Sequence, residues 1–190
     1  GDDDIAWRAV QATVDAGAGA DTLRLDPALL GDPATSAALT VNLALANANQ
    51  VTAGGVAGAV WRNFEHLQAA DWDRNLTVTA HAGGSHIATG SGADAVTLGA
   101  GADQVSTGAG ADRVVGAIGA ADTVDLGAGD DTATWAASAQ GSVDGGADTD
   151  TLLYAGGAAT INLATDARFA NFENLAAASA TGPITFTGVA

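Results

Sequence analysis

Apolar side chains recur every nine residues through the middle of the chain, at Val96, Val105 and Val114. The residues beside each valine are mostly small or polar, which is the alternation of a short strand with one buried face. A glycine-rich word of the form G-x-G-x-D ends two residues before each valine and predicts a tight turn. The pattern therefore predicts repeated rows, each made of one turn and one strand.

Each row carries an aspartate two residues before its apolar position, and four rows carry a glycine two residues before the aspartate. One row has Gly119 a place earlier, so we expect an extra residue there. Val78 and Ile87 continue the apolar period backwards, but Ser85 replaces the aspartate. Because one row cannot bury its own apolar side chain, the rows must stack into a solenoid. The aspartates and glycines are Asp94, Asp103, Asp112, Asp122, Asp131, Gly92, Gly101, Gly110 and Gly129.

The words TGSGADAVT, LGAGADQVS, TGAGADRVV and LGAGDDTAT resemble the nonapeptide G-G-x-G-x-D-x-U-x of the RTX (repeats-in-toxin) calcium-binding family, with Thr or Leu in place of the first glycine. The resemblance implies an all-β fold, a parallel β-roll or right-handed β-solenoid with two nonapeptides in each coil. It also implies several calcium ions between the turns of successive coils. The aspartates and glycines named above would be the calcium ligands.

Two rows in each coil would sort the aspartates by steps of about eighteen residues. Asp94, Asp112 and Asp131 are then expected on one edge, and Asp103 and Asp122 on the other. The alternative is a calcium-free parallel β-helix whose aspartates only cap turns. That alternative explains the period but not the aspartate at the same register in every row.

The same pattern returns near both ends of the chain. Asp3 and Asp21 stand eighteen residues apart, and Asp150 follows Asp131 by nineteen, so all three are added to the candidate calcium ligands. Matching words reveal a longer duplication: GDDDIAW with GDDTATW, VDAGAGADTL with VDGGADTDTL, and NFEHL with NFENL. In the last pair we expect the phenylalanines and leucines in the core, and Glu65 and Glu173 as outward charges.

These repeats predict four segments. Residues 1–25 are RTX-like coils that end a preceding block, and residues 26–75 are an irregular β segment. Residues 76–134 are the RTX β-roll core, and residues 135–190 are a partial second copy of the module.

The amino-acid composition limits the classes of binding partner. The acidic residues are twenty aspartates and two glutamates against six arginines, and the net charge is −16. This charge argues against nucleic acid or membrane insertion. Short carboxylates in turns suit a hard cation such as calcium. Neighbouring copies of the module or a cell-surface glycan are the further partners considered.

We find no catalytic motif and expect no enzyme. The histidines are His66, His81 and His86, and there is no lysine or cysteine. The word HAGGSH raises the alternative of a transition-metal site at His81 and His86, but solvated imidazoles are the simpler interpretation. Trp61 and Trp72 are either core residues or a platform for stacking on a glycan.

The resemblance implies an extracellular or bacterial cell-surface location, reached by type I secretion. The main hypothesis is a calcium-binding structural module of a large secreted or surface RTX protein, of adhesin or surface-layer type. The alternatives are a calcium-triggered folding and secretion module of a toxin or exoenzyme, and a calcium-dependent glycan-binding module.

Overall fold

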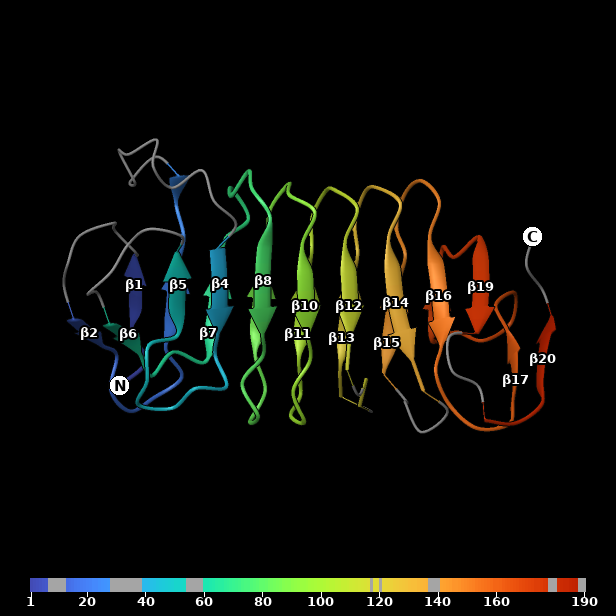
Figure 1. Cartoon of the computed structure of the whole chain (residues 1–190), viewed down its shortest axis with the longest axis horizontal. Helices are drawn as coiled ribbons and strands as arrows, with labels where there is room; N and C mark the ends of the chain where they lie inside the picture. Colours follow the sequence, from blue (N-terminus) through green and yellow to red (C-terminus); the bar gives the residue numbers. More distant parts are fainter. Residues whose placement is uncertain are drawn as a thin grey trace.

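The computed structural model is a parallel β-roll in which two sheets of eight strands face each other (Figure 1). The chain crosses from one sheet to the other at each turn, so consecutive strands lie in opposite sheets through the regular middle. The structure describes residues 1–6, 13–27, 39–53, 60–116, 118–119, 121–136, 141–177 and 181–187. The predicted all-β roll is confirmed.

The described residues form twenty strands. Sheet 1 contains β1 (Asp4–Ala6), β3 (Thr22–Arg24), β7 (His66–Gln68), β9 (His86–Ala88), β11 (Gln104–Ser106), β13 (Thr123–Asp125), β15 (Ser142–Asp144) and β18 (Phe169–Ala170). Sheet 2 contains β19 (Asn174–Ala177), β16 (Thr151–Tyr154), β14 (Thr132–Trp135), β12 (Arg113–Val115), β10 (Ala95–Thr97), β8 (Leu76–Thr79), β4 (Leu39–Asn42) and β5 (Val51–Ala53). Two small sheets pair β2 (Thr13–Asp15) with β6 (Val60–Arg62), and β17 (Ala159–Asn162) with β20 (Ile184–Thr187).

The strand register shows two rows in each coil. Val96 pairs with Val78 on one side and Val114 on the other, each eighteen residues away. Val105 pairs with Ile87 at eighteen residues and with Val124 at nineteen. The step lengthens where the extra residue near Gly119 was expected. These apolar side chains are buried between the two sheets and form the centre of the core.

Aromatic residues fill the core on either side of the regular middle. Trp61 stacks near Phe64 with ring centroids 6.1 Å apart, and Trp135 meets Phe169 edge to face at 5.0 Å. Trp61 and Trp72 are only 3% and 1% exposed. They are core residues, and their rings are not available for stacking on a glycan.

The duplication seen in the sequence recurs in the strand pairing. The run β1, β3, β7 is repeated by β14, β16, β19, and the pair β4 and β8 is repeated by β17 and β20. However, the first run lies in sheet 1 and the second run lies in sheet 2. The second copy therefore presents on one face of the roll what the first copy presents on the opposite face.

The segments expected from the sequence map onto the strands as follows. Residue 25 directly follows β3, and residue 76 begins β8. The expected boundary between residues 134 and 135 falls inside β14, and sheet 2 continues through it to β16. Residues 28–38 and 54–59 of the segment 26–75 lie outside the described residues, as does Trp7.

Candidate metal-binding turns

The aspartates of one edge form a continuous ladder of hydrogen bonds between coils. Asp94 accepts the Leu76 N–H through Oδ1 at 2.7 Å, and donates its own N–H to Asp112 Oδ1 at 2.7 Å. Asp112 donates to Asp131 Oδ1 at 2.7 Å, and Asp131 donates to Asp150 Oδ1 at 2.9 Å. The structure thus brings these four predicted residues together in one column.

The opposite edge carries a second column. Asp103 accepts the Ser85 N–H at 2.8 Å and donates its own N–H to Asp122 Oδ1 at 2.8 Å. At the start of the chain, Asp3 donates its N–H to Asp21 Oδ1 at 2.7 Å. The sorting by steps of eighteen or nineteen residues is as the sequence predicted.

Burial makes ionisation of these carboxylates unfavourable. Asp112 and Asp131 are 2% and 1% exposed, and loss of water raises the pKa of Asp112 to about 6 and that of Asp131 to about 7. Burial also raises the pKa of Asp94, Asp103 and Asp150 above the ordinary value of 3.8. A cation beside them would reverse this penalty.

The second carboxylate oxygen separates the aspartates into two groups. In the first group it accepts an N–H from the residue's own turn. Asp103 Oδ2 accepts the Gly99 N–H at 3.0 Å, and Asp122 Oδ2 accepts the Gly119 N–H at 2.5 Å. Asp94 Oδ2 accepts the Gly90 N–H at the longer distance of 3.4 Å. We call the turns that end at Asp94, Asp103 and Asp122 the closed turns.

In the second group Oδ2 is buried and has no hydrogen-bond partner among the described residues. The Thr107 hydroxyl lies close to Asp112, but it donates its hydrogen bond to the Leu126 carbonyl at 2.7 Å. We call the turns that end at these aspartates the open turns. The aspartates of the open turns are Asp21, Asp112, Asp131 and Asp150.

The open turns share an unusual backbone. In each one, the residues four and two positions before the aspartate have positive φ. In residues 107–112 these are Gly108 (φ 93°) and Gly110 (φ 137°). A Cβ on Gly110 would lie 2.1 Å from the carbonyl oxygen of Gly92 in the coil below, so the position also demands glycine for space. The other positive-φ residues of this kind are Gly17, Gly19, Gly127, Gly129, Gly146 and Asp148.

Positive φ redirects the amides of the open turns toward neighbouring coils. The Ala128 N–H donates to the Gly108 carbonyl at 2.9 Å, and the Gly110 N–H donates to the Ala128 carbonyl at 2.8 Å. The Ala147 N–H donates in the same way to the Gly127 carbonyl at 2.8 Å. The open turns that lead into β12, β14 and β16 stack along the upper row of loops in Figure 1. In this backbone geometry the Oδ2 atoms of the open-turn aspartates have no donor among the described residues.

Glu173 is exposed and Glu65 half-buried, and both have a further role that the sequence analysis did not predict, because they are part of the ladders. Glu65 Oε2 accepts the Asp21 N–H at 2.9 Å, and Glu173 Oε2 accepts the Asp150 N–H at 2.9 Å. Each glutamate stands two residues before a leucine, Leu67 in the core and Leu175 packed against it, which is the spacing of the aspartate in D-x-U. That spacing was the signal in the sequence that could have found them.

The histidines make local hydrogen bonds. His66 Nδ1 accepts the His86 N–H at 3.0 Å, and the two rings meet edge to face with centroids 5.0 Å apart. His81 Nδ1 accepts the Gly83 N–H at 3.1 Å. Since no three histidine, aspartate or glutamate side chains of the described residues group closely enough to hold a metal, this arrangement gives no support to a transition-metal site.

The donors of the open turns fit calcium. Within the described part of the chain, no three histidine, aspartate or glutamate side chains group closely enough to hold a metal by themselves. An ion there would combine one or two carboxylates with backbone carbonyl oxygens, which are donors that calcium accepts in numbers of six to eight. The unpartnered Oδ2 atoms of Asp112 and Asp131 are buried oxygens that need such a partner.

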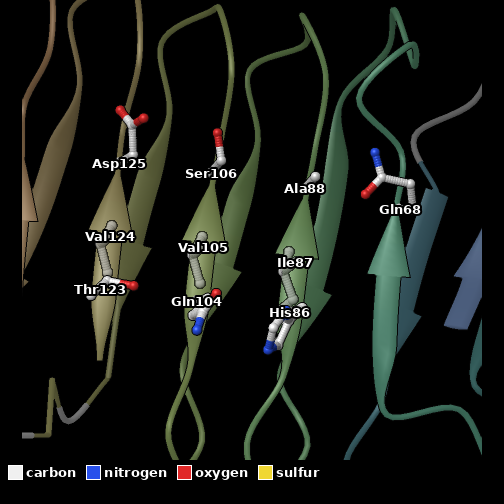
Figure 2. A pocket seen from close by; sticks show the side chains of 10 residues that line it. All are labelled: Gln68, His86, Ile87, Ala88, Gln104, Val105, Ser106, Thr123, Val124 and Asp125. Atoms are coloured by element: carbon white, nitrogen blue, oxygen red, sulfur yellow. The ribbon is translucent and has the colours of Figure 1, made fainter. Parts of the chain in front are cut away.

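An open depression lies on the outer face of sheet 1, across β7, β9, β11 and β13 (Figure 2). Its middle row is Val124, Val105 and Ile87, whose side chains belong to the core. The ionisable residues of its lining are His86 and Asp125, which stand at opposite ends of their strands and two strands apart. The depression therefore offers no adjacent acid and base for catalysis.

The stacked turns and carboxylate ladders define a β-roll with buried carboxylates in its turns. Residues 88–120 match the family model of the RTX calcium-binding nonapeptide repeat in four copies, so these residues are RTX repeats. RTX repeats bind Ca²⁺ and form a structural module. No curated protein and no solved structure matched the chain. Among the described residues, no helix has the length and apolar character needed to span a bilayer.

Proposed function

We propose that this chain is a calcium-binding structural module of a large secreted or cell-surface bacterial RTX protein, of adhesin or surface-layer type. It folds and becomes rigid when it meets extracellular calcium. The observation that carries the proposal is the column of buried aspartates that have no cationic partner. Ion pairs join arginines to Asp4, Asp15, Asp73 and Asp166, and none of these four aspartates belongs to the ladders.

The buried carboxylates lack a neighbouring positive charge, and this would make folding depend on calcium. Asp112, Asp131 and Asp150 lie in consecutive coils, and the charges of the first and third raise the pKa of Asp131 further. Bound calcium supplies the positive charge that such a column lacks. Extracellular calcium modules bind with dissociation constants of about 10⁻⁴ to 10⁻³ M, so the chain would stay unfolded in the cytosol and fold outside the cell.

The duplication supports an adhesin or surface-layer parent. The second copy continues the same two sheets, because β14 pairs with β12 on one side and with β16 on the other. Modules joined in this way would extend one stiff roll, which suits a protein that bridges distance at a cell surface. The glycan-binding alternative loses its main support, because Trp61 and Trp72 are buried.

Circular dichroism of the full chain with and without calcium tests the proposal. We expect little β structure after calcium removal and a cooperative gain of β structure as calcium rises to about 1 mM. Magnesium at the same concentration is the control and should produce little change, because it demands a tighter octahedral shell. An unchanged, cooperatively melting β spectrum in chelator would refute the calcium-dependent fold.

A further inference from the structure

The open and closed turns differ in how fully the protein itself uses the carboxylate. In the closed turn at Asp103, one oxygen accepts the Ser85 N–H and the other accepts the Gly99 N–H. Two peptide N–H groups already supply the positive electrostatic potential that a cation would provide. An ion there would have to displace the Gly99 N–H, whose hydrogen would then point at the ion.

The open turns lack this internal compensation. Asp131 Oδ1 accepts the Asp112 N–H, but Oδ2 is buried without a donor. Gly127 (φ 92°) and Gly129 (φ 130°) give this turn a positive-φ backbone that the closed turn at Asp103 lacks, and the Gly129 N–H donates to the Ala147 carbonyl at 3.1 Å. A buried carboxylate oxygen with no donor is costly unless a ligand completes it.

From this contrast we infer that calcium is held only at the open turns and that the closed-turn aspartates are structural hydrogen-bond acceptors. The inference rests on the proposed calcium-binding function and assigns its ions to particular turns. Calcium would bind at Asp21, Asp112, Asp131 and Asp150, whereas Asp94, Asp103 and Asp122 would hold successive coils together without an ion.

The amino-acid sequence does not make this distinction. Residues 99–103 and residues 108–112 both read GAGAD, yet the first word forms a closed turn and the second an open one. The neighbouring coils differ. The turn at Asp112 stacks on the turn at Asp131 through the bridge between Ala109 and Ala128. The turn at Asp103 lies instead between the turn that ends at Ser85 and the irregular turn that contains the extra residue.

The duplication gives a second, independent example of the open turn. The Gly17 N–H donates to Asp15 Oδ1 at 3.1 Å, and the Gly146 N–H donates to Asp144 Oδ1 at 3.1 Å. One coil earlier, Asp2 accepts the Ala20 N–H, as Asp130 accepts the Thr149 N–H. The turns before Asp21 and Asp150 therefore have the same construction, although they lie on opposite edges of the roll. Recurrence in both copies indicates that the open geometry is a property of the module.

The test compares Asp131→Asn with Asp103→Asn in the full chain, with bound calcium counted by equilibrium dialysis at saturation. Asp131→Asn should lose about one ion per chain. Asp103→Asn should keep the wild-type number of ions. It should be less stable than the wild type, because an amide NH2 in place of Oδ2 cannot accept the Gly99 N–H. An equal loss of ions in both variants would overturn the inference and leave the proposed function standing. A wild-type chain that binds no calcium would instead remove the proposed function.

If a variant does not fold, a second measurement on the wild-type chain tests the same assignment. Carboxyl carbon chemical shifts of the calcium-free and calcium-saturated wild-type chain can be compared at pH 5, where the calcium-free roll is more stable than at neutral pH. Asp112 and Asp131 should shift on calcium binding well beyond Asp103 and Asp122. Equal shifts at the two kinds of turn contradict the assignment.

Discussion

At the scale of single residues, the ladder aspartates determine how the calcium-free roll responds to pH. Burial raises the pKa of Asp112 to about 6 and that of Asp131 to about 7, against the ordinary value of 3.8 in an unfolded chain. The folded state thus binds these protons more tightly than the unfolded state does. The resulting stability is fully present below pH 3.8 and is lost as the pH rises through about 6 and 7.

We therefore expect acid to replace calcium in part. After calcium is removed with a chelating resin, the chain should show more β structure at pH 5 than at pH 8, as measured by circular dichroism. Two acids in surface ion pairs do not oppose this trend at pH 5. Hydrogen bonds from Arg168 lower the pKa of Asp166, and one from Asn63 lowers that of Asp15, so both remain charged. More β structure at pH 8 than at pH 5 would show that carboxylate burial is not what opposes folding.

At the scale of elements, the motif N-F-E-x-L brings the chain back to the ladder after an intervening segment of the sequence. Asn63 and Asn171 both have positive φ, near 61° and 54°, and each donates its side-chain N–H to an aspartate of β2 or β15. The following phenylalanine is buried, and the glutamate accepts a ladder N–H. The first excursion separates the ladder partners by 44 residues and the second by 23. The motif thus fixes where the chain rejoins the ladder, whatever the length of the intervening segment.

Substitution of Glu173 should show that the acceptor oxygen matters at this re-entry. Glu173→Ala leaves the N–H of the buried Asp150 without a partner and should cost about 1 to 3 kcal/mol of unfolding free energy. Glu173→Gln keeps an acceptor oxygen of the same reach and should cost less. Guanidinium unfolding in saturating calcium measures both. Equal losses would mean that the charge of Glu173, and not its hydrogen bond, stabilises the coil.

At the scale of the whole molecule, the two copies belong to one roll. Strands equivalent to β1, β3 and β7 reappear in the opposite sheet, so corresponding surfaces of successive copies face opposite ways. In a fibre made of such modules, a given surface of the module would face one way in one copy and the opposite way in the next. This arrangement would let one fibre present the same surface to partners on both sides.

Lengthening the chain tests the continuous roll. A protein with residues 1–128 duplicated ahead of the present chain should gain six strand spacings in sheet 1, which is roughly 30 Å at about 4.8 Å each. Small-angle X-ray scattering in calcium should show this increase in maximum dimension with an unchanged cross-section. The present chain is the control. A broad distribution of lengths would instead indicate separate modules joined by flexible linkers.

Much of the roll and of its candidate sites could be predicted from the sequence, because each row repeats the same local chemistry. The period gave the buried positions of Val96 and Val105, and the eighteen-residue step gave the two columns of aspartates. The re-entry glutamates were missed because a longer acidic side chain in a diluted motif looks like a surface charge. Only the fold shows that Glu65 lies beside Asp21, 44 residues away.

The sequence by itself thus determined the repeated row, its buried valine and the register of its carboxylate. The tertiary structure alone decided which carboxylates remain without a donor. Identical GAGAD words close at Asp103 and open at Asp112, since the direction of the turn amides depends on the coil stacked against them. The Asp112 turn stacks on a turn of the same positive-φ geometry and keeps its Oδ2 without a donor, whereas Asp103 Oδ2 accepts the Gly99 N–H of its own turn.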